Sequence, residues 1–379
     1  MNGGMELYLH MPFCVRKCAY CDFLSFPTDQ ETQNLYTRRL REDIDAMGKK
    51  YGDIPVDTIF IGGGTPSVPD SALIVGIMEH VRKAFHVAEG AEISMEANPG
   101  TVTREKLTDY RRAGINRLSF GLQSANDREL KLLGRIHTWA EFLESFHLAR
   151  ECGFTNINID LMSALPGQTR ESWKDTLKRV TDLNPEHISA YSLIIEDGTP
   201  FGEKYGSEEG RKLLPDEDSE REMYHETKRF LRDCGYERYE ISNYAKPGRA
   251  CRHNIGYWTG LPYLGLGLGA SSYMDGCRFA VNSDMKQYLE EKPGMFTDVE
   301  KLTKKDMEEE FFYVGLRMTA GVSLPEFERR FGCPRRTSIR GSWKCLWRKK
   351  RQYFQGDRFV LTDYGLDVSN YIMAQFLQD

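Results

Sequence analysis

The stretch ELYLHMPFCVRKCAYCDF, residues 6–23, decides how this chain folds. Its start, Glu6–His10, places leucines at alternate positions and so predicts a β-strand. The loop that follows carries Cys14, Cys18 and Cys21 in the spacing C-x3-C-x2-C. The chain has nine cysteines, an odd number, and no segment that resembles an export signal. Three clustered thiols in such a chain indicate a metal or redox site rather than a disulfide framework.

These three thiols predict an iron–sulfur cluster. A cubane 4Fe–4S cluster normally takes four thiolates, so three cysteines would leave one iron open to a substrate or cofactor. Structural zinc is the alternative, with His10 or Asp22 as the fourth ligand. Zinc sites more often use two separated C-x2-C pairs, and the sequence has no second pair. We therefore expect the cluster.

Strand and helix patterns alternate up to about residue 193. Each expected strand is short and apolar, an amphipathic helix follows it, and glycine or proline marks most boundaries. The expected strands are Glu6–His10, Asp57–Ile61, Glu92–Ala97, Arg117–Gln123, Asn156–Met162 and His187–Leu193, and the expected helices are Gln30–Lys49, Ala72–Phe85, Thr103–Ala113, Asn126–Leu133, Trp139–Glu151 and Arg170–Leu183. This alternation predicts an α/β fold with parallel strands, and six units fall short of the eight of a closed barrel. We expect a partial parallel (β/α)6 barrel with its reactive residues at the carboxyl ends of the strands.

The strand–helix alternation stops after about Thr199. Residues 203–220 are polar and charged, and we interpret them as a connector. A helix over Glu220–Cys234 and an aromatic, glycine-rich stretch over Tyr236–Tyr273 follow. We interpret this part of the chain as a smaller α/β extension of the barrel.

The last part of the chain predicts a small separate unit. Helices over Asp306–Met318 and Leu366–Phe376, with the segment RFVLTDYG between them, indicate a winged-helix-like region. Such a fold does not by itself define a function. The expected regions are 1–200 for the barrel, 201–297 for the extension and 298–379 for the C-terminal region.

Composition and charge exclude several classes of protein. Hydrophobic residues make up 40% and charged residues 28% of the chain, which excludes wholesale disorder. The net charge is −5, so no overall basic field attracts nucleic acid, and we expect no nucleic-acid partner. We interpret the acidic run Glu308–Glu310 and the basic run Arg348–Arg351 as solvated faces, although the basic run could instead contact a membrane surface. Without a secretory signal or an apolar stretch of ~18 residues, we expect a cytoplasmic protein.

The cysteine loop resembles that of the radical S-adenosylmethionine (SAM) superfamily. Four further motifs extend the resemblance: IGGGTPS (61–67), EANPG (96–100), RLSFGLQS (117–124) and DLMSALPGQT (160–169). As a set they are similar to those of the oxygen-independent coproporphyrinogen III oxidases and of their relatives, the haem chaperones of the HemW type. The resemblance implies a 4Fe–4S cluster whose open iron binds SAM, and one electron would then cleave SAM to a 5′-deoxyadenosyl radical. Such chemistry belongs to the cofactor, and the protein positions it.

The resemblance also implies which residues contact SAM. Tyr8 belongs to the first strand, and the glycines would let the backbone approach the methionine amino group because no Cβ stands in the way. Glu96 would accept hydrogen bonds from ribose hydroxyls or an ammonium group. In the relatives, Gln123, Arg135 and Asp160 line the site of a second SAM or of the substrate, where a guanidinium can bind a carboxylate through two bonds. The implied SAM residues are Tyr8, Gly63, Gly64, Thr65, Glu96, Gln123, Arg135 and Asp160.

Two features separate the chain from the oxidases. The oxidases carry a fourth cysteine two positions after the third, where this chain has Phe23. They also carry an extension before the cysteine loop, and we interpret that extension as missing because Cys14 comes so early. Both features match the haem chaperones instead.

A further motif, CRHNIGYW at residues 251–258, resembles the H-N-x-x-Y-W signature of the haem chaperones. An imidazole is a good axial ligand for haem iron, and aromatic side chains can cover the macrocycle. The resemblance implies haem at His253, flanked by Tyr257 and Trp258. Cys251 is an alternative thiolate ligand. A buried polar histidine packed beside two aromatic residues is the plain structural alternative.

Three functions therefore compete. The resemblance implies a chaperone that binds haem or porphyrin and delivers haem to acceptor haemoproteins, with an electron donor such as flavodoxin or ferredoxin if SAM is cleaved. The second function is a coproporphyrinogen III oxidase, an enzyme that releases carbon dioxide from two propionates and leaves vinyl groups. The third is a zinc-bound interaction module. We expect the chaperone and do not expect the oxidase activity, and the sequence leaves the oligomeric state open, including a homodimer.

Overall fold

Six parallel strands form the centre of the computed structural model, which describes residues 3–332 and 352–377. The strands are β1 (Met5–Met11), β2 (Val56–Gly63), β3 (Val87–Ala97), β4 (Arg117–Gln123), β5 (Ile157–Ser163) and β6 (His187–Ser192). They lie side by side in chain order, each parallel to the next. The predicted partial barrel of six parallel strands is confirmed.

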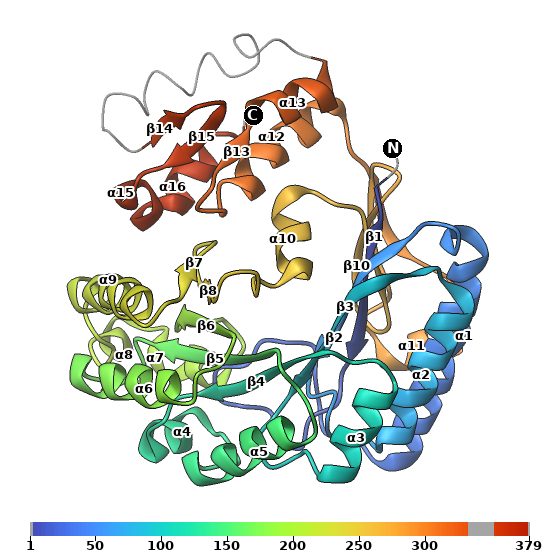
Figure 1. Cartoon of the computed structure of the whole chain (residues 1–379). Coiled ribbons are helices and arrows are strands. Elements are labelled where there is room, and N and C mark those ends of the chain that lie inside the picture. The colour runs from blue at the N-terminus through green and yellow to red at the C-terminus, as the bar shows by residue number, and fades with distance from the viewer. Residues whose placement is uncertain (1–2, 333–351, 378–379) are drawn as a thin grey trace.

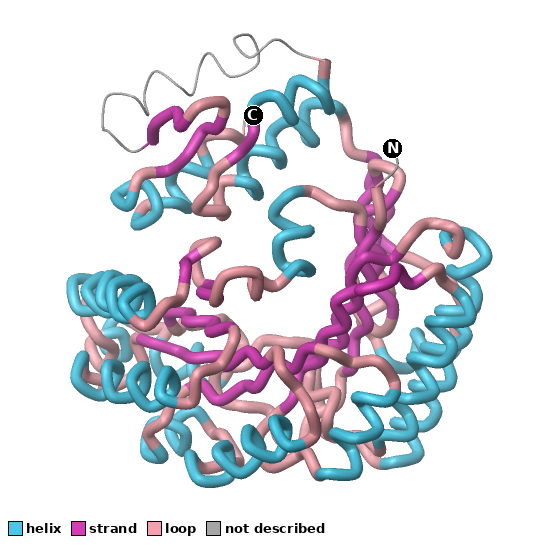
Figure 2. Tube along the Cα trace, viewed as in Figure 1, coloured by secondary structure: helices cyan, strands magenta, loops and turns pink. Residues whose placement is uncertain are grey.

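Helices cover the outer, convex face of this sheet (Figures 1 and 2). They are α1 (Gln30–Tyr51), α2 (Ser71–Ala84), α3 (Arg104–Arg112), α4 (Asp127–Leu133), α5 (Trp139–Glu151) and α6 (Arg170–Asp182). Polar side chains set the helix starts, as where Thr138 and Glu141 form a capping box before α5. Apolar strand residues such as Leu7, Ile59 and Leu118 are fully buried in the core. Because side chains alternate along a strand, the residues between them point into the barrel.

The sheet continues past both edges of the barrel. Beside β1 lie β9 (Tyr263–Leu266), which is parallel to it, and then the antiparallel strands β10 (Ser271–Met274), β11 (Cys277–Ala280) and β12 (Thr297–Lys301). Beside β6 lie β8 (Asn243–Ala245) and β7 (Glu237–Arg238), both added in antiparallel fashion. The expected extension, residues 201–297, therefore widens the barrel's own sheet. The division of the chain at residues 200 and 297 stays a prediction.

The expectation of a connector over residues 203–220 is wrong. This part of the chain forms the short helices α7 (Pro200–Tyr205) and α8 (Glu208–Arg211) and the start of α9 (Glu217–Asp233). Thr199, Ser207 and Asp216 each cap one of these helices by accepting a backbone N–H. Phe201 and Tyr205 are buried against the end of α4, so two apolar anchors suffice to hold an otherwise charged segment.

The C-terminal region has its own small core. Its elements are α12 (Lys304–Gly315), β13 (Val322–Ser323), α13 (Leu324–Phe331), β14 (Gln352–Gln355), β15 (Arg358–Leu361), α15 (Asp363–Asp367) and α16 (Ser369–Ala374). The strands form an antiparallel sheet in the order β13-β15-β14, as expected of a winged-helix-like unit. The single helix expected over Leu366–Phe376 is instead two short helices, because Val368 leaves the helical conformation with φ −116° and ψ 30°.

Two charged runs of the C-terminal region are expected to be solvated faces, the acidic run Glu308–Glu310 and the basic run Arg348–Arg351. In the acidic run, Glu310 instead pairs with Arg278 of β11 at 2.9 Å and so ties α12 to the main sheet. The basic run Arg348–Arg351 lies outside the described residues. No helix in the described part of the chain is long and apolar enough to cross a bilayer.

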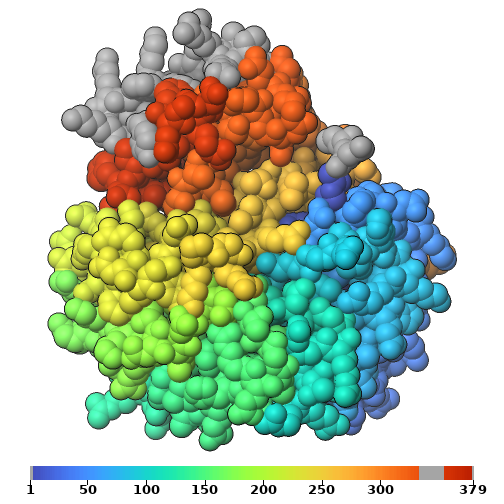
Figure 3. All heavy atoms as spheres, viewed as in Figure 1, coloured from blue at the N-terminus to red at the C-terminus, as the bar shows by residue number. Residues whose placement is uncertain are grey.

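Helix α10 (Arg252–Thr259) lies on the concave side of the sheet, between the barrel strands and the C-terminal unit (Figure 1). The space-filling view shows the C-terminal unit resting on the segment that contains α10 and β8 (Figure 3). The remaining helix, α11 (Met285–Glu290), packs near α1. The haem-type motif of residues 251–258 is therefore enclosed by the rest of the fold.

Candidate functional site

The cysteine loop is closed onto the end of β1. Cys14 N–H donates to the Phe26 carbonyl at 3.2 Å, and Phe26 N–H donates to the Pro12 carbonyl at 2.9 Å. Cys14 is buried, and Cys18 and Cys21 are half-buried. Burial raises the pKa of the Cys14 and Cys21 thiols, so bound cations would be needed to hold both as thiolates.

His10 is not free to act as the fourth ligand of a zinc ion. Both ring nitrogens of His10 are engaged: Nδ1 lies 3.0 Å from the Tyr8 hydroxyl and Nε2 lies 2.9 Å from the Leu24 carbonyl. The second contact makes Nε2 the protonated nitrogen, so Tyr8 donates to Nδ1. Asp22 is exposed. Among the described residues, no group of three His, Cys, Asp or Glu side chains is close enough to hold a single metal ion.

Glycines let the end of β2 pack against the cysteine loop. Gly63 has φ +112°, and a Cβ there would lie 2.4 Å from the His10 ring. A Cβ on Gly64 would lie 2.5 Å from the Phe13 carbonyl oxygen. Thr65 N–H donates to that same carbonyl at 2.6 Å. The glycines are therefore required for the loop to close, whatever ligand the backbone meets.

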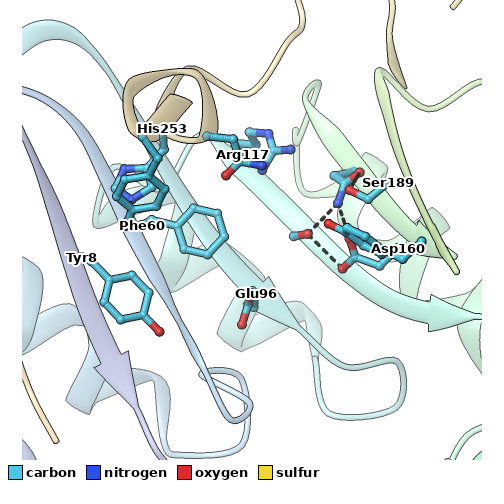
Figure 4. Close-up of a pocket in the computed structure, with 12 residues that line it drawn as sticks. Tyr8, Phe60, Glu96, Arg117, Asp160, Ser189 and His253 are labelled. Atoms are coloured by element: carbon cyan, nitrogen blue, oxygen red, sulfur yellow. Dashed lines mark hydrogen bonds between the residues drawn. The ribbon is translucent and has the colours of Figure 1, made fainter. Parts of the chain in front are cut away.

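A cavity of about 220 Å³ occupies the inside of the barrel (Figure 4). Five residues that the sequence implicated come together in its wall: Tyr8, Glu96, Asp160, His253 and Tyr257. The structure adds seven that sequence reasoning missed: Phe60, Arg117, Ser119, Asn158, Ser189, Tyr191 and Asn254.

The missed residues follow one pattern. In RLSFGLQ, NINIDLM and HISAYSL, polar residues alternate with apolar ones although the strands are buried. Alternation in a buried parallel strand indicates a polar barrel interior, and this was the signal that could have found them.

Two carboxyl groups in the cavity have pKa values raised above their usual range. Burial, with Asp160 nearby, raises the pKa of Glu96 to about 8. Glu96 accepts the Gly63 N–H at 3.0 Å, which links the cavity to the glycine turn. Burial also raises the pKa of Asp160, which accepts hydrogen bonds from Asn158 at 2.8 Å and Ser119 at 3.2 Å (Figure 4). Carboxyls of this kind suit a ligand that brings donors or positive charge.

Arg117 is the cation of the cavity. Its side chain is 2% exposed, and its Nε has no hydrogen-bond partner among the described residues. Its charge contributes to lowering the pKa of both His253 and His187, after the larger effect of burial. Both imidazoles are therefore neutral at physiological pH.

The haem-type motif is built into the cavity wall through α10. His253 is 1% exposed; its Nδ1 lies 2.7 Å from Thr58 Oγ1 and its Nε2 lies 2.9 Å from the Tyr257 hydroxyl. Burial lowers the pKa of His253 to about 3. The first backbone N–H groups of α10, those of Arg252 and His253, donate to Glu92, which anchors the helix by its N-terminus.

The other motif residues take different places. Trp258 faces the C-terminal unit, with the Arg317 guanidinium 4.3 Å from the centre of its indole ring. The structure therefore brings His253 and Tyr257 together and sets Trp258 apart. Cys251 is fully buried, and burial raises its pKa to about 12, so it is a neutral thiol and a poor iron ligand.

Five implied SAM residues lie outside the cavity: Gly63 and Gly64 of the glycine turn, and Thr65, Gln123 and Arg135. Arg135 lines a small hollow beside the cysteine loop together with Cys18. Thr65 Oγ1 accepts a hydrogen bond from the Asn98 side chain at 2.8 Å. Gln123 ends β4 with φ +73°, a left-handed backbone conformation that is uncommon for a residue with a side chain.

Comparisons with known proteins identify relatives of this chain by sequence and by structure. A family model described as the radical SAM superfamily matches residues 8–180, and one described as the HemN C-terminal domain matches residues 302–368. The solved structure of coproporphyrinogen III oxidase (HemN) from Escherichia coli, titled a radical SAM enzyme, superposes with a TM-score of 0.86 at 25% identity. That superposition covers 99% of this chain and 91% of the oxidase.

Curated relatives match this chain over 70% to 98% of its length. The heme chaperone HemW of Bacillus subtilis is 35% identical over 374 residues, which is 98% of both chains. The protein of the same name from Lactococcus lactis is 34% identical over 98% of this chain and 97% of its own. HemW of Escherichia coli is 42% identical over 70% of this chain and 69% of its own. This chain therefore belongs to the HemW family of heme chaperones, within the radical SAM superfamily.

Proposed function

We propose that this protein binds a 4Fe–4S cluster, SAM and haem, and that it hands haem to acceptor haemoproteins. The observation that carries the proposal is the match to the curated heme chaperones over 98% of the chain. Phe23 in place of a fourth cysteine and the H-N-x-x-Y-W sequence at His253 support the same assignment. Membership of the radical SAM superfamily implies the first two cofactors.

The residues fit the cluster and SAM. The three thiols of Cys14, Cys18 and Cys21 lie in one loop, and thiolates are the donors that iron–sulfur clusters use. The glycine turn at Gly63 and Gly64 offers backbone close to that loop, and Glu96 and Asp160 would accept donors of SAM. When bound, the cluster would hold SAM and supply one electron to it, with a flavodoxin or ferredoxin as the source. Tyr8, whose hydroxyl donates to His10, would pack against the ligand.

The haem site is proposed at His253. Its imidazole is held neutral, which is the form that binds iron, and Phe60 and Tyr257 lie against the ring at centroid distances of 5.2 and 4.8 Å. Its Nε2 already meets the Tyr257 hydroxyl, so iron binding needs Tyr257 to move aside. The cavity of about 220 Å³ is also smaller than the roughly 300–1,000 Å³ of pockets for drug-sized ligands. Haem at this residue therefore requires the Tyr257 side chain to move and the cavity to widen.

The oxidase is the second candidate, favoured by the TM-score of 0.86 to the Escherichia coli oxidase. Fold likeness alone does not transfer an activity. The two candidates share the barrel and differ in the fate of the tetrapyrrole: the oxidase would convert its propionates, whereas the chaperone would release haem unchanged.

An anaerobic haem titration of the reconstituted protein, followed by absorbance, tests the haem site. We expect one haem per chain, and His253→Ala should weaken binding at least tenfold and shift the Soret band because the axial nitrogen is lost. The matched control is His86→Ala, which removes an exposed histidine. Absence of haem binding by the wild type would contradict the function. Unchanged affinity and spectrum in His253→Ala would contradict only the assigned ligand.

A further inference from the structure

Arg135 makes contacts that a role in carboxylate binding does not explain. Its Nη1 donates to the Sγ of Cys18 at 3.6 Å, a normal length for a hydrogen bond to sulfur. Its Nη2 donates to Asn98 Oδ1 at 2.6 Å and to the Gly121 carbonyl at 2.5 Å. Both terminal nitrogens therefore already have partners in the protein. A two-bond contact between a guanidinium and a carboxylate uses Nη2, and both Nη2 hydrogens of Arg135 are already donated, so a carboxylate could bind in this way only by displacing Asn98 or Gly121.

The backbone around Arg135 is fastened to the cysteine loop. Ala19 N–H donates to the Leu133 carbonyl at 3.0 Å, and the Arg16 side chain donates to the Gly134 carbonyl at 2.8 Å. Gly134 ends α4 with φ +76°, and a Cβ there would lie 3.4 Å from the Ala19 nitrogen. The two hydrogen bonds and the left-handed turn at Gly134 fix where the chain leaves α4, and so they fix where the Arg135 side chain starts.

A guanidinium held against a cluster thiolate acts on the electron affinity of the cluster. Added negative charge on the cluster spreads onto its cysteine sulfurs, and hydrogen bonds or positive charges at those sulfurs stabilise the reduced form. Water screens this interaction less than it would at the surface, because the site is half-buried and the Arg135 Nε is fully buried. The matching charge on α4, Arg128, is exposed.

We propose that Arg135 is a positioning residue for the cluster: it holds Cys18 by a charge-assisted hydrogen bond and raises the cluster's reduction potential. The inference rests on the cluster of the proposed function, and it gives Arg135 a role different from binding a carboxylate of SAM or substrate. The two roles separate experimentally, because the first changes the potential without any ligand present and the second changes only ligand affinity.

The test is a potentiometric titration of the anaerobically reconstituted full-length protein without SAM, with the reduced cluster counted by electron paramagnetic resonance. Arg135→Gln should shift the midpoint potential to a more negative value at unchanged iron and sulfide content. Arg135→Lys, which keeps the charge and loses the fixed fork, should fall between that variant and the wild type. Arg128→Gln, the matched loss of an arginine from α4, should leave the potential at the wild-type value.

Other outcomes decide against the proposal. A wild-type potential in Arg135→Gln, with SAM binding weakened, would assign the residue to a ligand carboxylate and overturn the inference. If Arg135→Gln assembles no cluster, Arg135→Lys decides, and a wild-type potential in that variant overturns the inference as well. Failure of the wild type to assemble any cluster would instead refute the proposed cofactor, so the two failures are distinguishable.

Discussion

Glu6, on β1, is a buried residue whose ionisation costs the folded state free energy. It is 1% exposed, its Oε2 has no hydrogen-bond partner among the described residues, and burial raises its pKa to about 8. A carboxyl whose pKa is raised on folding stabilises the fold below its unfolded pKa near 4.5, and this stabilisation is lost as pH rises through 8. At about 1.36 kcal/mol per pKa unit, the loss is at most about 5 kcal/mol.

We therefore predict that Glu6→Gln is as stable as the wild type near pH 5 and more stable, by a few kcal/mol, at pH 8.5. Anaerobic urea unfolding of both proteins across this range measures the difference. Glu89→Gln, which removes an exposed carboxylate from β3, should show no growing difference with pH. Equal pH dependence in Glu6→Gln and the wild type would refute the argument.

Among single residues, the sequence predicted the site residues that belong to family motifs. It missed cavity residues that only the polar–apolar alternation of the strands indicates. The cysteines, Glu96 and Asp160 were found because the family motifs name them. Arg117 was missed because no family motif gives it a role, although the alternation of Arg117 and Ser119 with apolar residues along β4 indicates a polar barrel interior. Arg135 was named, but its bond to Cys18 joins residues 117 positions apart and could not be read from spacing.

Helix α10 is the element that ties the barrel interior to the rest of the molecule. Its packing against β1 depends on Gly256, because a Cβ there would lie 2.0 Å from the Glu6 Oε1. Its other anchor is Glu92 on β3, which accepts the N–H groups of Arg252 and His253. A side chain at position 256 would therefore require either α10 or the Glu6 side chain to move.

Gly256→Ala should destabilise the protein by about 2–3 kcal/mol, because the inserted methyl group must displace either α10 or the Glu6 side chain. Thermal unfolding of the single variant and of Gly256→Ala combined with Glu6→Ala measures the coupling. Removing the carboxylate should recover part of the loss, so the two effects should not add. Additive losses would show that the contact with Glu6 is not the cause.

Prediction of helices and strands from the sequence succeeded where the hydrophobic period and the segment length indicate the same element. The six strands and the helices between them follow from their own residues, whereas the helices at 200–217 were missed because charge obscured two buried aromatic anchors, Phe201 and Tyr205. The pairing of β9 with β1 joins segments about 250 residues apart. No local sequence pattern predicts such a pairing, because the pairing depends on which edge of the sheet the later part of the chain meets.

For the whole molecule, the C-terminal unit packs on α9, α10 and the sheet, largely through polar contacts that include the pairs His225–Asp367 and Lys228–Asp363. Arg317 lies over Trp258 and within 3.5 Å of the buried Glu240, and Arg278 pairs with Glu310. The unit keeps a separate hydrophobic core around Phe312. Trp258 of the haem-type motif thus contacts the C-terminal unit, while His253 of the same helix lines the cavity.

Deleting residues 303–379 should spare cluster assembly, because the barrel core is complete without them. The deletion should abolish haem transfer, because α10 loses the C-terminal unit that supports it. The cut leaves β12 in the sheet, since that strand ends at Lys301. Iron content, and haem recovered in an acceptor haemoprotein, measure the two outcomes against the full chain. Haem transfer at the full rate by the shortened protein would remove the C-terminal unit from the function.

Anaerobic turnover tests whether this barrel carries a tetrapyrrole without converting it. The reconstituted protein, with cluster and SAM binding verified, would be incubated with coproporphyrinogen III, SAM and a strong reductant, and mass spectrometry would follow the substrate. The Escherichia coli oxidase serves as the positive control. We predict that coproporphyrinogen III stays unchanged with this protein. Loss of two carbon dioxides over many turnovers, abolished by Cys18→Ala, would contradict it and make the protein an oxidase.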